Sequence, residues 1–139
     1  MRLAIAAVLV ATALAAAGCG AVGIVTANDG NAVQGKVLFK ANCGACHTLA
    51  NAGTTGTTGP DLDAAFAAAK GPLFRGPDTL QTIRDVVRGQ IAYADSDPDT
   101  GTPSDPTIGM PANILRGQQA RDVAVYVAEC AANPHCGVK

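Results

Sequence analysis

Hydrophobic residues recur along most of this chain every three or four positions, which is the spacing of amphipathic helices. No segment shows a convincing alternation of apolar and polar residues that would indicate a β-strand. The sequence therefore predicts a small all-α domain whose helices are joined by long loops. The expected helices cover about 31–41, 61–70, 78–89 and 117–131.

Residues suited to helix capping stand at the expected helix starts. Asp29 or Asn31 precedes the first helix and Asp61 the second, and Asp78 is followed by Gln81 at the spacing of a capping box. Each helix then has an apolar stripe. The stripe residues are Val33, Val37 and Leu38; Leu62, Ala65, Phe66 and Ala69; Leu80, Ile83 and Val87; and Ala120, Val123, Tyr126, Val127 and Cys130.

The N-terminal part of the chain has a different character. Residues 3–27 contain no charged side chain and follow a single basic residue. Such a run is typical of a secretion leader or a membrane anchor and not of a globular fold. We therefore expect a leader or anchor over 1–27 and one domain over 28–139.

Three fates of this N-terminal stretch remain open. Cleavage before Cys19 with lipidation of that cysteine would give a lipoprotein, although Ala16 stands where that signal normally prefers leucine. Ordinary signal peptidase could cut after Ala17 or Ala27, because small residues precede both positions. An uncleaved stretch would be long enough to span a membrane. In each case the domain would lie on the outer, periplasmic face of the cytoplasmic membrane.

Composition indicates a domain that needs help to form a core. Its roughly 110 residues beyond the leader include two tyrosines, three phenylalanines and no tryptophan. A large apolar cofactor would supply the missing buried volume. The formal net charge is −1 and no basic stripe is present, so the sequence gives no sign of nucleic-acid binding.

The chemistry of the chain is concentrated in Cys43-Gly-Ala-Cys46-His47. Two cysteines separated by two residues, with a histidine next, form the attachment signature of c-type haem. Each thiol can add to one haem vinyl group, and the histidine then projects toward the iron. A redox dithiol has no need of His47, and a zinc site needs further ligands at compatible spacing. The expected cofactor is one covalent haem c.

A second axial ligand is expected some 60 residues after the first. Beyond the leader the chain has one methionine, Met110, and one further histidine, His135. Met110 lies between Gly109 and Pro111 in a loop, where core filling is a less natural role than ligation. We therefore favour Met110, with His135 or an open coordination position as alternatives.

The remaining cysteines form a pair near the C-terminus. Cys130 and Cys136 are separated by a short Asn-Pro turn and are predicted to form a disulfide that anchors the C-terminal residues. Two unpaired buried thiols are the alternative.

The chain resembles class I c-type cytochromes over about residues 30–131. The resemblance is carried by Cys43 to His47, Gly59-Pro60, Arg88-Gly89 at a helix end, Met110-Pro111, and Gly35 and Phe39 facing Tyr126. It implies a small cytochrome c fold with packed terminal helices around one haem. It also implies that the carbonyl of Pro60 accepts the ring N–H of His47, and that His47 and Met110 ligate iron.

The resemblance implies a one-electron carrier that is not an enzyme, because two axial ligands leave iron no site for substrate. Its partners would be redox proteins, such as a quinol-oxidising complex and a terminal oxidase or reductase. The carrier itself is expected to be a monomer. The alternatives are a haem subunit of a larger oxidoreductase, and a sensor or peroxidase if the iron site is open.

Two features stay unassigned by the sequence. The loop at 93–107 is longer and more acidic than is usual for this family; its glycine and Pro106 do not fit a calcium loop, so we expect a solvated acidic loop. Haem propionates need partners, and charge alone makes Arg75, Arg84 and Arg88 candidates.

Overall fold

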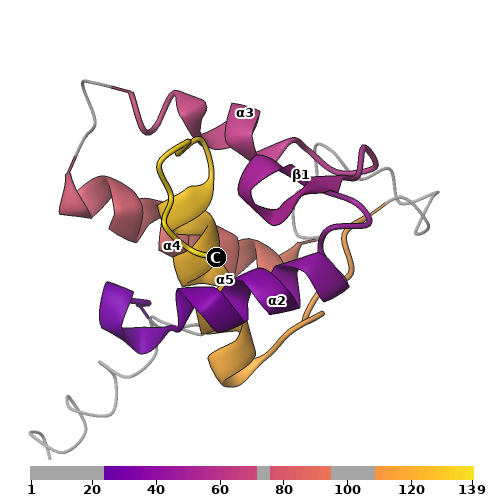
Figure 1. The fold of residues 1–139 in the computed structure, drawn as a ribbon. Helices are drawn as coiled ribbons and strands as arrows, with labels where there is room; N and C mark the ends of the chain where they lie inside the picture. Colours follow the sequence, from indigo (N-terminus) through magenta and orange to yellow (C-terminus); the bar gives the residue numbers. More distant parts are fainter. Residues whose placement is uncertain (1–23, 72–75, 95–108) are drawn as a thin grey trace, which may run out of the picture.

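The computed structural model describes residues 24–71, 76–94 and 109–139. Its described elements are mostly helical, as predicted, and α2, α4 and α5 form the centre of the fold (Figure 1). In chain order they are η2 (Ala27–Asp29), α2 (Ala32–Asn42), β1 (Thr48–Leu49), η3 (Ala50–Ala52), β2 (Thr54–Thr55), α3 (Leu62–Ala67), α4 (Pro77–Tyr93) and α5 (Gly117–Cys130), where η marks a 3-10 helix.

Some predicted features lie outside the described residues. These are Cys19 with most of the apolar N-terminal stretch, Arg75, and almost all of the acidic loop. Among the helices in the described ranges, none has the length and apolar character needed to cross a membrane.

Helices α2 and α5 cross in close contact at Gly35. A Cβ atom on Gly35 would lie 2.7 Å from Cβ of Tyr126 and would overlap the backbone carbonyl of Asp122. The Asp122 carboxylate then accepts a hydrogen bond of 2.8 Å from the backbone N–H of Asn31, the N-cap residue of α2. The two terminal helices are therefore locked together both by shape and by a hydrogen bond across the start of α2.

One turn beyond the crossing, two aromatic rings complete the contact. Phe39 of α2 and Tyr126 of α5 are 1% and 0% exposed, and their ring centroids lie 5.9 Å apart at 61°. This edge-to-face arrangement is favourable beyond the area that the rings bury. The predicted partnership of Gly35, Phe39 and Tyr126 is thus confirmed.

The buried face of α2 differs from the predicted stripe. Val33 and Val37 are 54% and 59% exposed, whereas Gly35 and Phe39 are buried. The reason is that the close approach to α5 selects the face that carries the smallest side chain, and the valines lie on the other side. Leu38, the third residue of the predicted stripe, is partly buried against the core.

Helix α4 is longer than predicted and begins differently. Gly76 is its N-cap and Pro77 its first residue, whereas the side chain of Gln81 donates to Val25 and Asp85 instead of closing a capping box with Asp78. The helix also continues through Gly89, contrary to the expectation that it ends there. Burial of Ile91 and Ala92 beyond the glycine outweighs the modest helix penalty of glycine.

The segment after the cysteine motif contains a small hairpin that the sequence analysis missed. Strands β1 and β2 pair antiparallel, with Thr48 opposite Thr55 and Leu49 opposite Thr54. Two-residue strands are too short to leave an alternation in the sequence. The helix predicted after Asp61 is present as α3, and Asp61 caps it by accepting from two backbone N–H groups.

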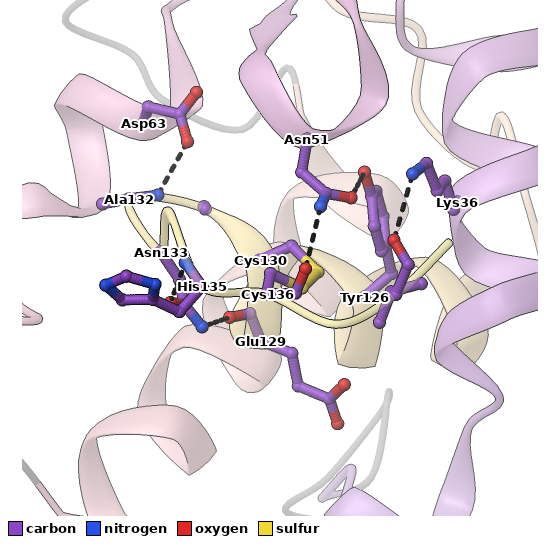
Figure 2. The surroundings of a disulfide bond; sticks show 12 residues. Lys36, Asn51, Asp63, Tyr126, Glu129, Cys130, Ala132, Asn133, His135 and Cys136 are labelled. Carbon is purple, nitrogen blue, oxygen red and sulfur yellow. Dashed lines mark hydrogen bonds between the residues drawn. A yellow bond between two sulfur atoms is a disulfide. The ribbon is translucent and has the colours of Figure 1, made fainter.

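The C-terminal residues fold back over the loops that follow α2 (Figure 2). Cys130 and Cys136 form a disulfide, as predicted, with their Cα atoms 5.1 Å apart. The carbonyl of Cys136 accepts from the side chain of Asn51, whose own oxygen accepts from the Tyr126 hydroxyl at 2.9 Å. Burial, and to a lesser degree the nearby charge of Asp63, raises the pKa of Tyr126 to about 12, so this phenol remains a donor.

The crossing of α2 and α5 predicts a specific mutational result. Gly35→Ala should lower the free energy of unfolding of the haem-loaded protein by about 1–3 kcal/mol, because the added methyl group forces the helices apart. Gly89→Ala in α4 is the matched control, since a Cβ there meets nothing within 4 Å. It should be neutral or stabilise by up to about 1 kcal/mol. Denaturant unfolding measures both, and equal effects of the two substitutions would contradict this account.

Candidate functional site

The end of α2 carries the predicted attachment residues. Cys43 is the C-cap residue, and its backbone N–H donates to the carbonyl of Phe39 at 2.8 Å. The chain then turns tightly, because the N–H groups of Cys46 and His47 both donate to the carbonyl of Cys43, at 3.1 and 2.9 Å. The turn places the two thiols and the imidazole at one end of the α2–α5 pair.

The two thiols have different surroundings. Cys43 is 7% exposed and belongs to the hydrophobic core cluster, whereas Cys46 is exposed, and both are free. Burial, followed by the proximity of Cys46, raises the pKa of Cys43 to about 11. The buried Cys43 therefore lacks the lowered pKa that activates the nucleophilic thiol of a redox dithiol.

A zinc site also finds no support in the described ranges. No group of three or more histidine, cysteine, aspartate or glutamate side chains gathers there in a geometry that could hold a metal. Haem attachment therefore remains the preferred interpretation of the cysteine pair over a redox dithiol and a zinc site.

The short hairpin packs directly on the cysteine turn. A Cβ on Gly44 would lie 2.5 Å from the Thr54 side chain, and a Cβ on Gly56 would lie 2.5 Å from both the carbonyl oxygen of Ala45 and the carbonyl carbon of Cys46. These two glycines let the backbone of the hairpin approach the turn closely. The loop that contains Gly56 was predicted only as a low-complexity connection, yet Gly56 is what allows it to pack on the backbone of the cysteine turn.

His47 is fixed by the segment that follows the hairpin. Its Nδ1 lies 2.9 Å from the carbonyl oxygen of Pro60, which confirms the predicted contact. Because a carbonyl can only accept, Nδ1 carries the proton and Nε2 keeps a free lone pair. Gly59 lies against the ring, and a Cβ there would be 2.5 Å from Cε1 of His47. The ring is thus held in an orientation in which Nε2 would be able to bind a metal.

Met110 and His135, the two candidates for the second axial position, lie in different environments. Met110 is partly buried and packs against the same core cluster that contains Cys43. His135 is exposed, in the loop closed by the C-terminal disulfide (Figure 2). The position of Met110 is the one suited to a ligand within the apolar interior.

The segment after Met110 is anchored by a residue that the sequence analysis did not identify. Asn113 adopts a left-handed conformation with φ of 56°. Its backbone N–H donates to the carbonyl of Ile91 at 2.6 Å and its side chain donates to the carbonyl of Ala92 at 3.1 Å. Asparagine tolerates this conformation better than most residues, which is the signal that could have revealed it.

The arginines of α4 differ in whether their donors are satisfied. Arg84 is buried, and its Nε donates to the carbonyl of Val25 at 3.0 Å while Nη2 donates to Gln81. Arg88, one turn later, has a buried Nε with no hydrogen-bond partner. Its neighbour Val87 packs against the same core cluster as Met110 does. A buried donor without a partner at this position fits an anionic group of a cofactor, such as a haem propionate.

The residues around the cysteine turn therefore fit a haem. Two free thiols stand beside a histidine whose Nδ1 is bonded to Pro60, the buried Nε of Arg88 on α4 has no partner, and Met110 packs against the core cluster that contains Cys43.

Comparison with known proteins agrees with this geometry. The family model described as "Cytochrome c" matches residues 32–131, from the start of α2 to the residue after α5. No curated protein and no solved structure matches the chain significantly. The family match covers well over half of the chain. It includes the cysteine turn, the Gly59-Pro60 segment that contacts His47, and Met110. The chain belongs to the cytochrome c family, whose members bind haem c covalently and generally carry electrons.

Proposed function

We propose that this protein is a monohaem one-electron carrier with His47 and Met110 as axial ligands, acting outside the cytoplasmic membrane. The observation that carries the proposal is the hydrogen bond between His47 Nδ1 and the Pro60 carbonyl, which leaves Nε2 available as a strong ligand. When bound, the haem iron supplies the one-electron couple. The protein holds, orients and shields that group.

The attachment residues act once, during maturation. The S–H bond of Cys43 and that of Cys46 each add across a vinyl double bond, so that the sulfur bonds to carbon and the proton is retained on the product. Cys43 would hold the haem toward the apolar core, and the exposed Cys46 would hold it near the surface. An exposed cofactor edge of this kind is where electrons would enter and leave.

Thioether coordination by Met110 favours ferrous iron and raises the reduction potential. With both axial positions taken, oxygen and peroxide have no place to bind. This is why we favour a carrier over a sensor or peroxidase.

The proposed location is the periplasmic face of the cytoplasmic membrane, with attachment through a lipid on Cys19 or through an uncleaved leader. This part of the proposal is supported by the apolar run at 3–27 and by the outer-side chemistry of haem attachment. Partners would be a quinol-oxidising complex and a terminal oxidase or reductase, and each contact would be small and transient.

Ligation by Met110 is tested with carbon monoxide. The ferrous wild-type protein should not bind it readily, whereas Met110→Ala should bind it rapidly because one axial position opens. The variant should also lower the midpoint potential by more than about 59 mV, a tenfold change in the one-electron equilibrium. His135→Ala is the control and should change neither property. Rapid binding by the wild type would replace the carrier with a sensor or peroxidase.

The contact of the Gly59-Pro60 segment with His47 is tested by Gly59→Ala. The new methyl group should push the imidazole away from Pro60, weakening the hydrogen bond that sets the tautomer and basicity of the ring. We expect a changed haem absorption spectrum and a shifted midpoint potential. Gly137→Ala, where a Cβ meets nothing within 4 Å, is the control. A wild-type spectrum for Gly59→Ala would contradict the proposal that the Pro60 contact sets the properties of the His47 ring.

The role of Arg88 is tested by Arg88→Gln. We propose that its guanidinium binds a haem propionate, so removing the positive charge should stabilise ferric iron and lower the midpoint potential by about 30–60 mV. Arg121→Gln removes the same charge from α5, where the guanidinium donates to Gln118, and should have a much smaller effect. Equal shifts for the two variants would show a general charge effect and no specific contact.

A further inference from the structure

The packed structure begins before the boundary predicted at residue 28. Val25 is 1% exposed, and its side chain lies in a small apolar cluster with Ala124 and Val125 of α5. The preceding residue, Ile24, is 76% exposed. The change from an exposed to a buried apolar side chain therefore occurs between Ile24 and Val25, inside the expected leader, which ends at residue 27.

The backbone of Val25 is also part of the fold. Its N–H donates to the carboxylate of Asp85 at 3.2 Å, and its carbonyl accepts from Gln81 at 2.9 Å and from Arg84 Nε at 3.0 Å. Arg84 is only 5% exposed, so this carbonyl satisfies a buried cation. Three side chains of one face of α4 thus depend on a residue that sequence analysis assigned to the leader.

Residues 26–29 connect Val25 rigidly to α2. The Asp29 carboxylate accepts from both the backbone N–H and the hydroxyl of Thr26, each at 2.8 Å, and these bonds lower the pKa of Asp29. The carbonyl of Asp29 in turn accepts from the Gln118 side chain of α5 at 2.7 Å. We call residues 25–29 the N-terminal segment.

We propose that the N-terminal segment is a permanent part of the mature haem domain, so that any proteolytic processing takes place upstream of Val25. Cleavage after Ala27 would remove Val25 from its apolar cluster and leave the Nε of Arg84 buried without an acceptor. Such orphaned buried donors are costly and rare in native proteins. Of the processing sites that the sequence allows, those at Ala17 and Cys19 are compatible with the fold and that at Ala27 is not.

A tether attached through Cys19 would be short, a consequence that rests on the proposed attachment at that residue. Only five residue steps separate Cys19 from Ile24, a reach of at most about 18 Å. The edge of the domain formed by the N-terminal segment and the start of α5 would then face the membrane. Partners would reach the cofactor from the remaining surface.

The mature N-terminus gives the direct test. The haem-loaded protein is purified after export with its own N-terminal stretch, and its intact mass is measured. A chain that begins at or before Val25, with or without lipid, supports the proposal. A functional chain that begins at Thr26 or later overturns it. The outcome is independent of axial ligation, which is measured by the spectrum of the same sample.

A second test asks whether the segment stabilises the domain. Two haem-loaded forms, beginning at Gly20 and at Asn28, are exported with a foreign cleavable leader. The shorter form should unfold at a temperature lower by roughly 10 °C, because it loses a buried side chain and the acceptor of Arg84. Equal midpoints would overturn the proposal.

A pair of point variants keeps the test informative if the shorter form fails to accumulate. Val25→Asp should lower the thermal midpoint strongly, whereas Ile24→Asp, which makes the same kind of change one residue earlier at an exposed position, should not. Val25→Ala should give an intermediate loss. Similar effects of the two aspartate variants would contradict the burial of Val25. In every folded variant the haem spectrum should match the wild type.

Discussion

The rest of the structure depends on the close contact between α2 and α5 at Gly35. Because no side chain separates the helices there, the backbone of α2 approaches the carbonyl of Asp122 directly. A helix held this closely has one allowed rotation about its axis. That rotation buries Phe39 and Cys43 on the same side, four residues apart, and leaves Cys46 exposed at the surface. The packing of a glycine thus determines where both thiols stand.

A second constraint holds the loops around the cysteine turn, and it originates at the far end of the chain. The C-terminal residues beyond α5 bond to α2 through Lys36, to the hairpin region through Asn51 and to α3 through Asp63 (Figure 2). Asp63 also accepts from the backbone N–H of Ala50 with its other oxygen, at 2.7 Å. One carboxylate therefore joins η3, α3 and the C-terminal tail. The disulfide closes this arrangement by keeping the tail folded back.

The sequence was a good guide wherever a residue type has a single physical role. The capping side chains of Asn31 and Asp61 and the Cys130–Cys136 pair follow from local chemistry, the Pro60 contact follows from the family resemblance, and the structure confirms all of them. The predictions failed where tertiary packing selects one of several helix faces or helix ends that the sequence pattern does not distinguish. Val33 and Val37 form an apolar stripe, yet α5 contacts the other side of the helix because Gly35 is there.

Other parts could not have been read from local patterns at all. Gly89 stops a helix only when nothing beyond it gains from continuing, and here Ile91 and Ala92 gain burial. Gly44 is an unspecified position of the haem attachment motif and Gly56 a loop residue in the sequence, because the segments that pack against them are not adjacent in the chain. The burial of Val25 could not be predicted for a related reason. An apolar residue of a leader and an apolar residue of the core have the same sequence pattern when their contacts are unknown.

The thin core explains why these backbone contacts matter so much. The described cluster around Phe39 and Tyr126 contains few large side chains, and several of its members are alanines. A domain of this size buries too little apolar surface to tolerate loose loops. Covalent haem would add apolar volume to such a core. The glycine contacts, the Asn113 anchor and the hydrogen bond of His47 to Pro60 fix the backbone around the cysteine turn and after Met110, where the core itself offers few large side chains.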